Sequence, residues 1–400
     1  MTTANATIVR FALNTWQWPF APNGRRGICY LLFAALLFLF LPAGAQQPPA
    51  PYEVRTIAVT PVKSIRGLSA VTDNIVWASG TGGQVGISTD GGEHWQWHIV
   101  PGCDSCDWRS LYAFDARKAI VLNAGEPALI FLTVDGGTSW TQVFRDDRQG
   151  IFFDAMQFFN DKEGIAIGDP LAHQFTVIRT HNGGRSWEPD PISTLPDANE
   201  GEAIFAASGT SVVALPGNNV YFATGGSVAR LFKSSSRKHN DSQQQSNKQT
   251  LKNGNNWQAY TIPVVQGSAT RGVFSIAFLD TRQGIAVGGD YKQDTARAGN
   301  CMITTNGGRN WFAPVTPPGG YKSCVAWINN SHLVATGTSG TDISIDGGMN
   351  WQKIGNGFNV AVKARKGHRV FLAGKNIAVL DPEHKGPATH GVNTGLLEEK

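Results

Sequence analysis

The chain has 400 residues, of which 41% are hydrophobic and 46 are glycine. This composition is typical of a globular chain with many turns and excludes a long low-complexity region. Its 34 basic and 30 acidic residues give a net charge of +4, without a basic stripe interleaved with aromatic residues, so we expect no nucleic-acid partner.

The first 45 residues have the pattern of a secretory signal peptide. An apolar run from Ile28 to Leu41 follows Arg25 and Arg26 and precedes the small residues AGA at 43–45. We expect cleavage near Ala45, export to the periplasm or the medium, and a flexible leader at residues 46–51. The alternative is an uncleaved membrane anchor, for which the apolar run is short. Any other membrane association is expected only through a membrane-protein partner.

A short motif recurs along the chain and predicts a set of similar hairpins. Copies occupy residues 88–95 (STDGGEHW), 133–140 (TVDGGTSW), 180–187 (THNGGRSW), 304–311 (TTNGGRNW) and 344–351 (SIDGGMNW), and a decayed copy, KNGNNW, occupies 252–257. We call these segments the box turns. The Asp or Asn side chain can bond to the backbone amides that follow, the two glycines accept positive φ, and the Trp can pack under the turn. We therefore expect structural roles for Asp90, Trp95, Asp135, Trp140, Asn182, Trp187, Asn306, Trp311, Asp346 and Trp351.

The spacing of the box turns predicts an all-β, seven-bladed β-propeller over residues 52–383. The closing tryptophans are mostly 40 to 54 residues apart, which is the length of one four-stranded blade. Between the turns, FFNDKEGIAIG at 158–168 is matched by FLDTRQGIAVG at 278–288, a pattern of strand, turn and strand. Blades are expected to begin near Ser64, Trp108, Phe152, Glu202, Val273, Lys322 and Phe358. Six blades is the alternative count.

The last predicted blade, Phe358 to Leu380, has no box turn and is one strand short. We expect Glu53 to Val59 to supply the missing strand, because closing the ring with strands from both chain ends removes exposed sheet edges. The polar segment 234–252, which interrupts the fourth blade, and the tail 384–400 are expected to be flexible.

Four cysteines follow the expected cleavage site, and export permits disulfides. Cys103 and Cys106 have the spacing of half a zinc site, but no second pair of this kind completes a tetrahedral set. We therefore expect a local disulfide between them, with no metal and no cofactor. The pairing of Cys301 and Cys324 stays open.

The box turns resemble the Asp-box, or BNR repeat, of sialidases and related propellers. Combined with the F-x-D/N and G-I-A-I/V-G patterns, they resemble the photosystem II stability/assembly factor family over roughly residues 60 to 380. This resemblance implies a non-enzymatic factor that holds a nascent membrane-protein subunit, but it does not identify a photosystem partner. The sialidase-like resemblance implies an alternative, a glycan-acting hydrolase. The Arg-Ile-Pro motif of such enzymes is absent, since the first inner strand reads SIRGL at 64–68.

Candidate ligand-binding residues are expected on the channel face, which lies opposite the box turns. Aligning the first strands superposes Arg109, Asp154 and Glu202, and the turns on the same face carry Glu126, Asp169 and Asp290. Arg179 and Arg230 are further candidates for holding an anion. If the protein is an enzyme, Glu202 and Asp154 are the expected acid–base pair. We favour a monomeric, non-enzymatic binding module with a protein partner, or a glycan or other anionic ligand, at this face.

Overall fold

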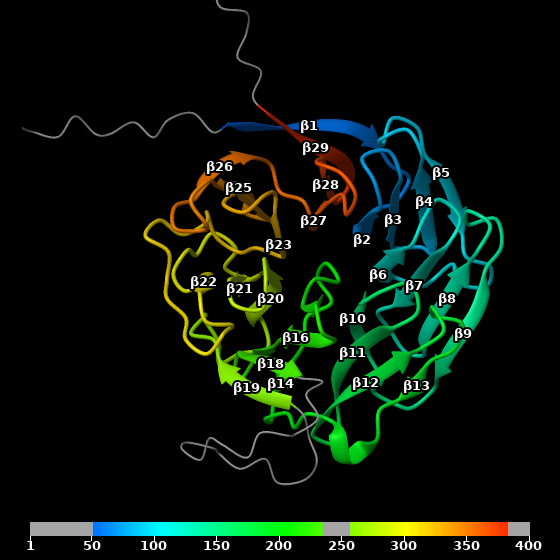
Figure 1. Ribbon diagram of the computed structural model, residues 1–400, viewed down its shortest axis with the longest axis horizontal. Helices are drawn as coiled ribbons and strands as arrows, with labels where there is room; N and C mark the ends of the chain where they lie inside the picture. Colours follow the sequence, from blue (N-terminus) through cyan, green and yellow to red (C-terminus); the bar gives the residue numbers. More distant parts are fainter. Residues whose placement is uncertain (1–50, 235–256, 383–400) are drawn as a thin grey trace, which may run out of the picture. The chain divides into compact units, whose positions relative to one another are not determined.

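The computed structural model describes residues 51–234 and 257–382. Within these residues the chain is all-β except for one turn of 3-10 helix, η2 (Ile192–Thr194), and no helix has the length and apolar character needed to cross a bilayer. The strands form seven sheets arranged as a ring, so the predicted seven-bladed β-propeller is confirmed (Figure 1). The predicted signal peptide at 1–45, the leader up to residue 50, the insertion from 235 to 252 and the tail at 384–400 lie outside the described residues.

The first three blades are regular four-stranded antiparallel sheets. Blade one contains β2 (Ile65–Ala70), β3 (Val76–Gly80), β4 (Gln84–Ser88) and β5 (Gln96–Ile99). Blade two contains β6 (Trp108–Ala113), β7 (Ala119–Asn123), β8 (Ala128–Thr133) and β9 (Thr141–Asp146). Blade three contains β10 (Phe153–Phe158), β11 (Gly164–Leu171), β12 (Gln174–Thr180) and β13 (Glu188–Pro189).

Blades four and five depart from this pattern. Blade four contains β15 (Val212–Leu215), β16 (Asn219–Ala223), β18 (Arg230–Ser234) and β19 (Trp257–Thr261). Blade five contains β20 (Arg271–Phe278), β21 (Gly284–Asp290) and β22 (Cys301–Thr304), and its sheet is extended through β17 (Gly225–Gly226) to β14 (Glu202–Ala203). Its fourth strand is reduced to an isolated bridge between Ile303 and Phe312.

The chain's two ends meet in the seventh blade. Blade six contains β23 (Cys324–Trp327), β24 (Leu333–Gly337), β25 (Gly340–Ser344) and β26 (Gln352–Gly355). Blade seven contains β27 (Val360–Lys363), β28 (Val370–Ala373), β29 (Asn376–Pro382) and β1 (Tyr52–Val59). β1 pairs antiparallel with β29, from Tyr52 opposite Pro382 to Val59 opposite Asn376, which confirms ring closure by the N-terminal strand.

The hydrophobic core is divided among the interfaces between blades. Each main cluster joins side chains from neighbouring blades, and each box tryptophan packs against the cluster that its blade shares with the preceding one. Trp351 of blade six, for example, packs with Ile285 and Ile303 of blade five and is 2% exposed. The box turns therefore connect two strands of one blade and also seal it against its neighbour.

The turn at 133–140 illustrates how the box turns are built. Gly137 donates its backbone N–H to Thr133 Oγ1 at 3.0 Å, Ser139 donates its N–H to Asp135 Oδ1 at 3.0 Å, and Trp140 Nε1 donates to the carbonyl of Gly137 at 3.1 Å. Both glycines have positive φ. The described turns at 88–95, 304–311 and 344–351 repeat these bonds. The turn at 180–187 differs in its tryptophan, whose Nε1 has no partner among the described residues.

The four described cysteines are free and buried. The disulfide that we expected between Cys103 and Cys106 is not formed. Both thiols lie inside the apolar cluster between blades one and two, and burial raises the pKa of Cys106 to about 12, so the neutral thiol is favoured. Cys324 has a structural role, since its sulfur accepts a hydrogen bond from the N–H of Ala361 in the next blade at 3.3 Å.

Candidate binding site at the channel mouth

Four inner strands carry a β-bulge near their first residues. The register shifts fall at Arg66 in β2, Arg109 in β6, Asp154 in β10 and Phe274 in β20. A bulge bends the strand and redirects the side chain of the extra residue, and bulges are common beside functional sites. Two guanidinium groups, a carboxyl and a phenyl ring are thereby placed at corresponding positions of blades one, two, three and five.

The segment Ile204–Thr210, which we call the channel loop, meets all four of these positions. It connects β14 to the inner strand of blade four, and Figure 1 shows this green segment reaching toward the centre of the ring. Ser208 Oγ donates to the carbonyl of Ser323 in blade six at 2.8 Å, and Thr210 Oγ1 lies 2.7 Å from Ser275 Oγ in blade five. Because the loop contacts blades on opposite sides of the ring, it crosses the channel mouth.

Two arginines bind the backbone of the channel loop. Arg66 Nη1 donates to the carbonyl of Ala207 at 2.8 Å, and Arg109 Nη1 donates to that of Ala206 at 3.4 Å. Arg109 is also ion-paired with Asp107, through Nε at 2.7 Å. Arg66 forms no ion pair with any described residue, and burial, followed by the nearby charge of Arg109, lowers its pKa. The channel mouth therefore holds a partly buried guanidinium whose charge is not matched by a bound carboxylate.

Two carboxyl groups lie beneath the channel loop. Asp154 is fully buried, and neither of its carboxyl oxygens accepts a hydrogen bond from a described residue. Asp169 accepts the N–H of Ile204 through Oδ1 at 2.8 Å. Burial and then the charge of Asp169 raise the pKa of Asp154 well above its usual range, while Arg109 opposes the shift. Burial raises the pKa of Asp169 to about 6, against the effect of the Ile204 N–H.

An aromatic cluster completes the channel mouth. Phe205 of the channel loop stacks on Phe274, with ring centroids 3.9 Å apart and planes 3° apart. Tyr321 and Tyr291 contact Phe274 edge to face, at centroid distances of 4.8 Å and 6.1 Å. Tyr291 is 46% exposed, so the cluster presents an aromatic surface to solvent beside the two arginines.

Glu202 does not occupy the position equivalent to Arg109 and Asp154, so our alignment of the first strands was wrong in blade four. The inner strand of that blade is β15, which begins at Val212, whereas Glu202 lies on β14. The channel loop, inserted before β15, shifts the register. The six other blades begin within two residues of their predicted starts.

The carboxylate of Glu202 belongs to a separate buried cluster. It accepts hydrogen bonds from Thr224 Oγ1 at 2.6 Å, from Arg230 Nε at 2.9 Å and from the N–H of Asn199 at 2.9 Å. The charged groups that act on Asp154 are instead Asp169 and Arg109. The structure thus does not bring Glu202 and Asp154 together as an acid–base pair, and it ties Arg230 to an internal carboxylate.

The remaining predicted residues bond within their own parts of the ring. Arg179 is paired with Asp190 at 2.9 Å, and Asp290 with Arg271 at 2.8 Å. Glu126 is exposed, accepts the N–H of Gly150 at 2.9 Å, and lines a pocket of about 280 Å³. Only Arg109, Asp154 and Asp169 of the predicted set therefore meet at the channel loop.

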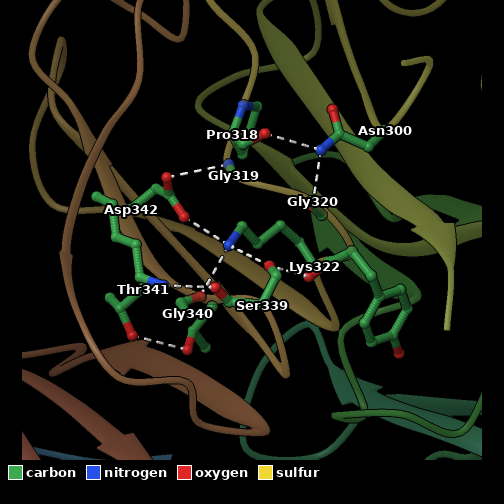
Figure 2. Close-up of polar contacts among 12 residues, drawn as sticks. Asn300, Pro318, Gly319, Gly320, Lys322, Ser339, Gly340, Thr341 and Asp342 are labelled. Carbon is green, nitrogen blue, oxygen red and sulfur yellow. Dashed lines mark hydrogen bonds and ion pairs between the residues drawn. The ribbon is translucent and has the colours of Figure 1, made fainter. Parts of the chain in front are cut away.

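A buried ion pair beside the aromatic cluster has no clear signal in the sequence. Figure 2 shows Lys322, near the end of the connection between blades five and six, facing Asp342 of β25, and both side chains are almost completely buried. Lys322 Nζ also donates to Ser339 Oγ and to the carbonyl of Gly340, each at 2.8 Å. Asp342 Oδ1 accepts the N–H of Gly319 at 3.0 Å. Because an unpaired charge is costly in such a place, this network fixes the segment that leads to Tyr321.

Comparisons with known proteins agree with this architecture. No family model matches the sequence. Over 136 residues the chain is 26% identical to the photosystem II assembly lipoprotein Ycf48 of Synechococcus sp. (strain CC9902). That alignment covers 34% of this chain and 38% of the relative, so the matched part is well under two thirds of the relative's length.

Solved structures match over most of the chain. A YCF48 bound to D1 peptide has a TM-score of 0.56 at 15% identity and covers 83% of this chain and 94% of its own. YCF48 from Cyanidioschyzon merolae has a TM-score of 0.56 at 17% identity, with coverage of 84% and 100%. The WD40 propeller domain of Doa1 has a TM-score of 0.53 at 11% identity, with coverage of 83% and 97%. At these identities the structural likeness shows the propeller fold. With the sequence match, it supports a β-propeller that resembles the photosystem II assembly factors.

Proposed function

We propose that this chain is an exported, non-enzymatic binding module that holds a segment of a protein partner at the channel face. The observation that carries the proposal is Arg66, a partly buried guanidinium without a carboxylate partner among the described residues. Burying an unpaired charge is unfavourable, and a carboxylate would satisfy the guanidinium with charge-assisted hydrogen bonds. The exposed ring of Tyr291 supplies an adjoining aromatic contact. An acidic side chain or a chain terminus next to an apolar residue fits this combination.

One of the similar structures supports a peptide as the ligand class, because that YCF48 is bound to D1 peptide. A photosystem subunit is accordingly a candidate partner for this chain. The glycan-acting alternative has less support, since the carboxylate of Glu202 is already bonded to Thr224 and Arg230.

Site-specific photocrosslinking in the native envelope tests where the partner binds. A benzophenone amino acid at Tyr291, on the channel face, should give a discrete adduct with a protein. The matched control places the same probe at Val134, which is 51% exposed in a box turn on the opposite face. Arg66→Gln should weaken the adduct at Tyr291. Equal adducts at the two positions, or an adduct unaffected by Arg66→Gln, would contradict the proposal.

Turnover assays separate the binding module from the hydrolase. The mature chain should release no chromophore from a panel of chromogenic glycosides. Turnover that disappears in Glu202→Gln would favour the enzyme.

Export is tested on the same protein. The chain recovered from the envelope should begin near Gln46 and elute as a monomer. A protein that keeps residues 1–45 would instead support a membrane anchor.

A further inference from the structure

The channel loop covers the groups that the proposed function requires. Its carbonyls at Ala206 and Ala207 occupy donors of Arg109 and Arg66, the two guanidiniums expected to bind an anionic segment. A carboxylate is a stronger acceptor for a guanidinium than a backbone carbonyl. A partner that presents a carboxylate therefore competes with this chain's own backbone for the two arginines.

The same loop also lies over two carboxyl groups, of which Asp154 is fully buried and Asp169 is half-buried. Asp169 holds the start of the loop through the N–H of Ile204, and the N–H of Ala206 lies near the carboxyl of Asp154. If the loop left this position, Ile204 and Ala206 would no longer cover the pair. Closing the loop would therefore also cover Asp154 fully and Asp169 in part.

We propose that the channel loop is a proton-sensitive cover, which closes over Asp154 and Asp169 when this pair holds a proton and opens as the pair ionises. Opening frees Arg66, which forms no ion pair with a described residue, for the partner segment. The consequence for binding rests on the proposed function, whereas the movement of the loop does not.

The sign follows from linkage between protonation and conformation. Burial raises the pKa of both acids in the closed state, with Asp169 near 6. In an open, hydrated state their pKa values would return toward the usual 3.8, so the closed state binds protons more strongly. Raising the pH therefore shifts the equilibrium toward the open state.

The charged residues around Asp154 and Asp169 do not themselves lose or gain a proton in this pH range. From β6, Arg109 favours the ionised form of Asp154, but it is shared with Asp107 and with the carbonyl of Ala206. From β2, Arg66 lies against the loop on the side of Tyr321, and burial and the charge of Arg109 lower its pKa. Both guanidiniums stay protonated at any pH that leaves the protein folded, so between pH 5 and 8 the change of charge at this place falls on the carboxyl pair and not on the two arginines.

Hydrogen exchange of the mature protein without any partner tests the cover directly. Protection factors of the amides in residues 203–210 should fall about tenfold between pH 5 and pH 8, because the equilibrium constant for opening rises as the carboxyl pair loses its proton. Amides of β24 provide the internal reference, because this strand lies in blade six and is completely buried. Since protection factors are corrected for intrinsic exchange, the pH dependence of the chemistry itself cancels.

Variants identify the groups responsible. Asp154→Asn combined with Asp169→Asn should keep the loop protected at pH 8 and remove the pH dependence. Asp290→Asn is the matched control, since this acid is paired with Arg271 on the same face and should leave the wild-type behaviour intact. A wild-type loop equally protected at pH 5 and 8 overturns the proposal, whether or not the double variant folds. A double variant that folds and retains the fall in protection also overturns it.

The crosslink at Tyr291 separates failure of the cover from failure of the proposed function. If both hold, the yield of that adduct should rise from pH 5 to pH 8 in the wild type and should be high at both values in the double variant. Loop opening without any adduct would contradict only the binding role. An adduct without loop opening would contradict only the cover.

Discussion

Individual box tryptophans differ in how much of the ring depends on them. Trp351 is 2% exposed and fills the interface between blades five and six, whereas Trp95 is only half-buried and stacks on Trp97 with centroids 5.4 Å apart. Trp351→Ala should therefore lower the free energy of unfolding by on the order of 3 to 5 kcal/mol, the range for a large core side chain. Trp95→Ala should lower it by less. Urea denaturation measures both, and equal losses would show that interface burial does not set the effect.

Residues whose partners lie close in the chain were the ones that the sequence could place. Each box turn is held by hydrogen bonds between residues that are at most four positions apart. The spacing of Ser or Thr, Asp or Asn, and glycine in the sequence is therefore enough to predict the turn. Lys322 precedes β23 and Asp342 lies on β25, and only the folded blade six brings them together. Arg66 was named only within SIRGL, as evidence against an enzyme, because its isolation from carboxylates is not visible in sequence.

At the scale of elements, the blade period predicts every inner strand except that of blade four. Two local departures coincide there, since the channel loop precedes β15 and the sheet of blade five extends back to β14. Glu202, a charged residue beside a short apolar run, therefore resembled the start of the inner strand of blade four. Arg109 and Asp154 were predicted correctly because they lie on the inner strands of regular blades. Asp169 lies on β11, which adjoins the inner strand of blade three, and so it reaches the channel loop as well.

The N-terminal strand should be indispensable for a closed ring. Val54 and Ile57 of β1 pack on the cluster shared by blades six, seven and one, whereas Val59 at the end of the strand is 83% exposed. Deleting residues 53–59 should leave β29 as an unpaired edge, so the truncated protein should aggregate or unfold less cooperatively. Deleting residues 46–51 is the control and should leave a single transition. Light scattering and thermal unfolding measure both effects, and two unchanged proteins would show that β1 is dispensable.

For the whole molecule, the core is a circular series of interfaces; five clusters are each shared by two blades, and one is shared by blades six, seven and one. Polar groups also link the inner strands in sequence. Ser69 Oγ accepts the N–H of Ala113, Ser110 Oγ that of Met156 and Ser275 Oγ that of Val325. Because the unfolding of one blade would remove contacts from the blades on both sides of it, we expect the ring to unfold as one cooperative unit rather than blade by blade.

The carboxyl pair of Asp154 and Asp169 should contribute to how the stability of this unit depends on pH. The folded pKa of Asp169 is raised from 3.8 to about 6, mainly by burial. The favourable contribution of Asp169 to the free energy of unfolding is therefore complete below about pH 4. It is lost as the pH rises through about 6, a change on the order of 1 to 3 kcal/mol. Asp135 acts in the opposite sense, because its side-chain and backbone bonds to Ser139 lower its pKa to about 2. That contribution is lost only as the pH falls through about 2, so the two effects occur in separate pH ranges.

Replacing the more deeply buried acid should remove much of this pH dependence. Asp154→Asn keeps the shape of the side chain but carries no charge, and it also relieves the repulsion that Asp154 shares with Asp169. The variant should be more stable than the wild type at pH 8, where burying an ionised carboxyl is costly, and should show little gain at pH 4.5, where the wild-type pair is protonated. Urea denaturation at the two pH values measures the difference. An equal gain at both would mean that the substitution acts through packing, and the buried charge would then not control the stability of the ring.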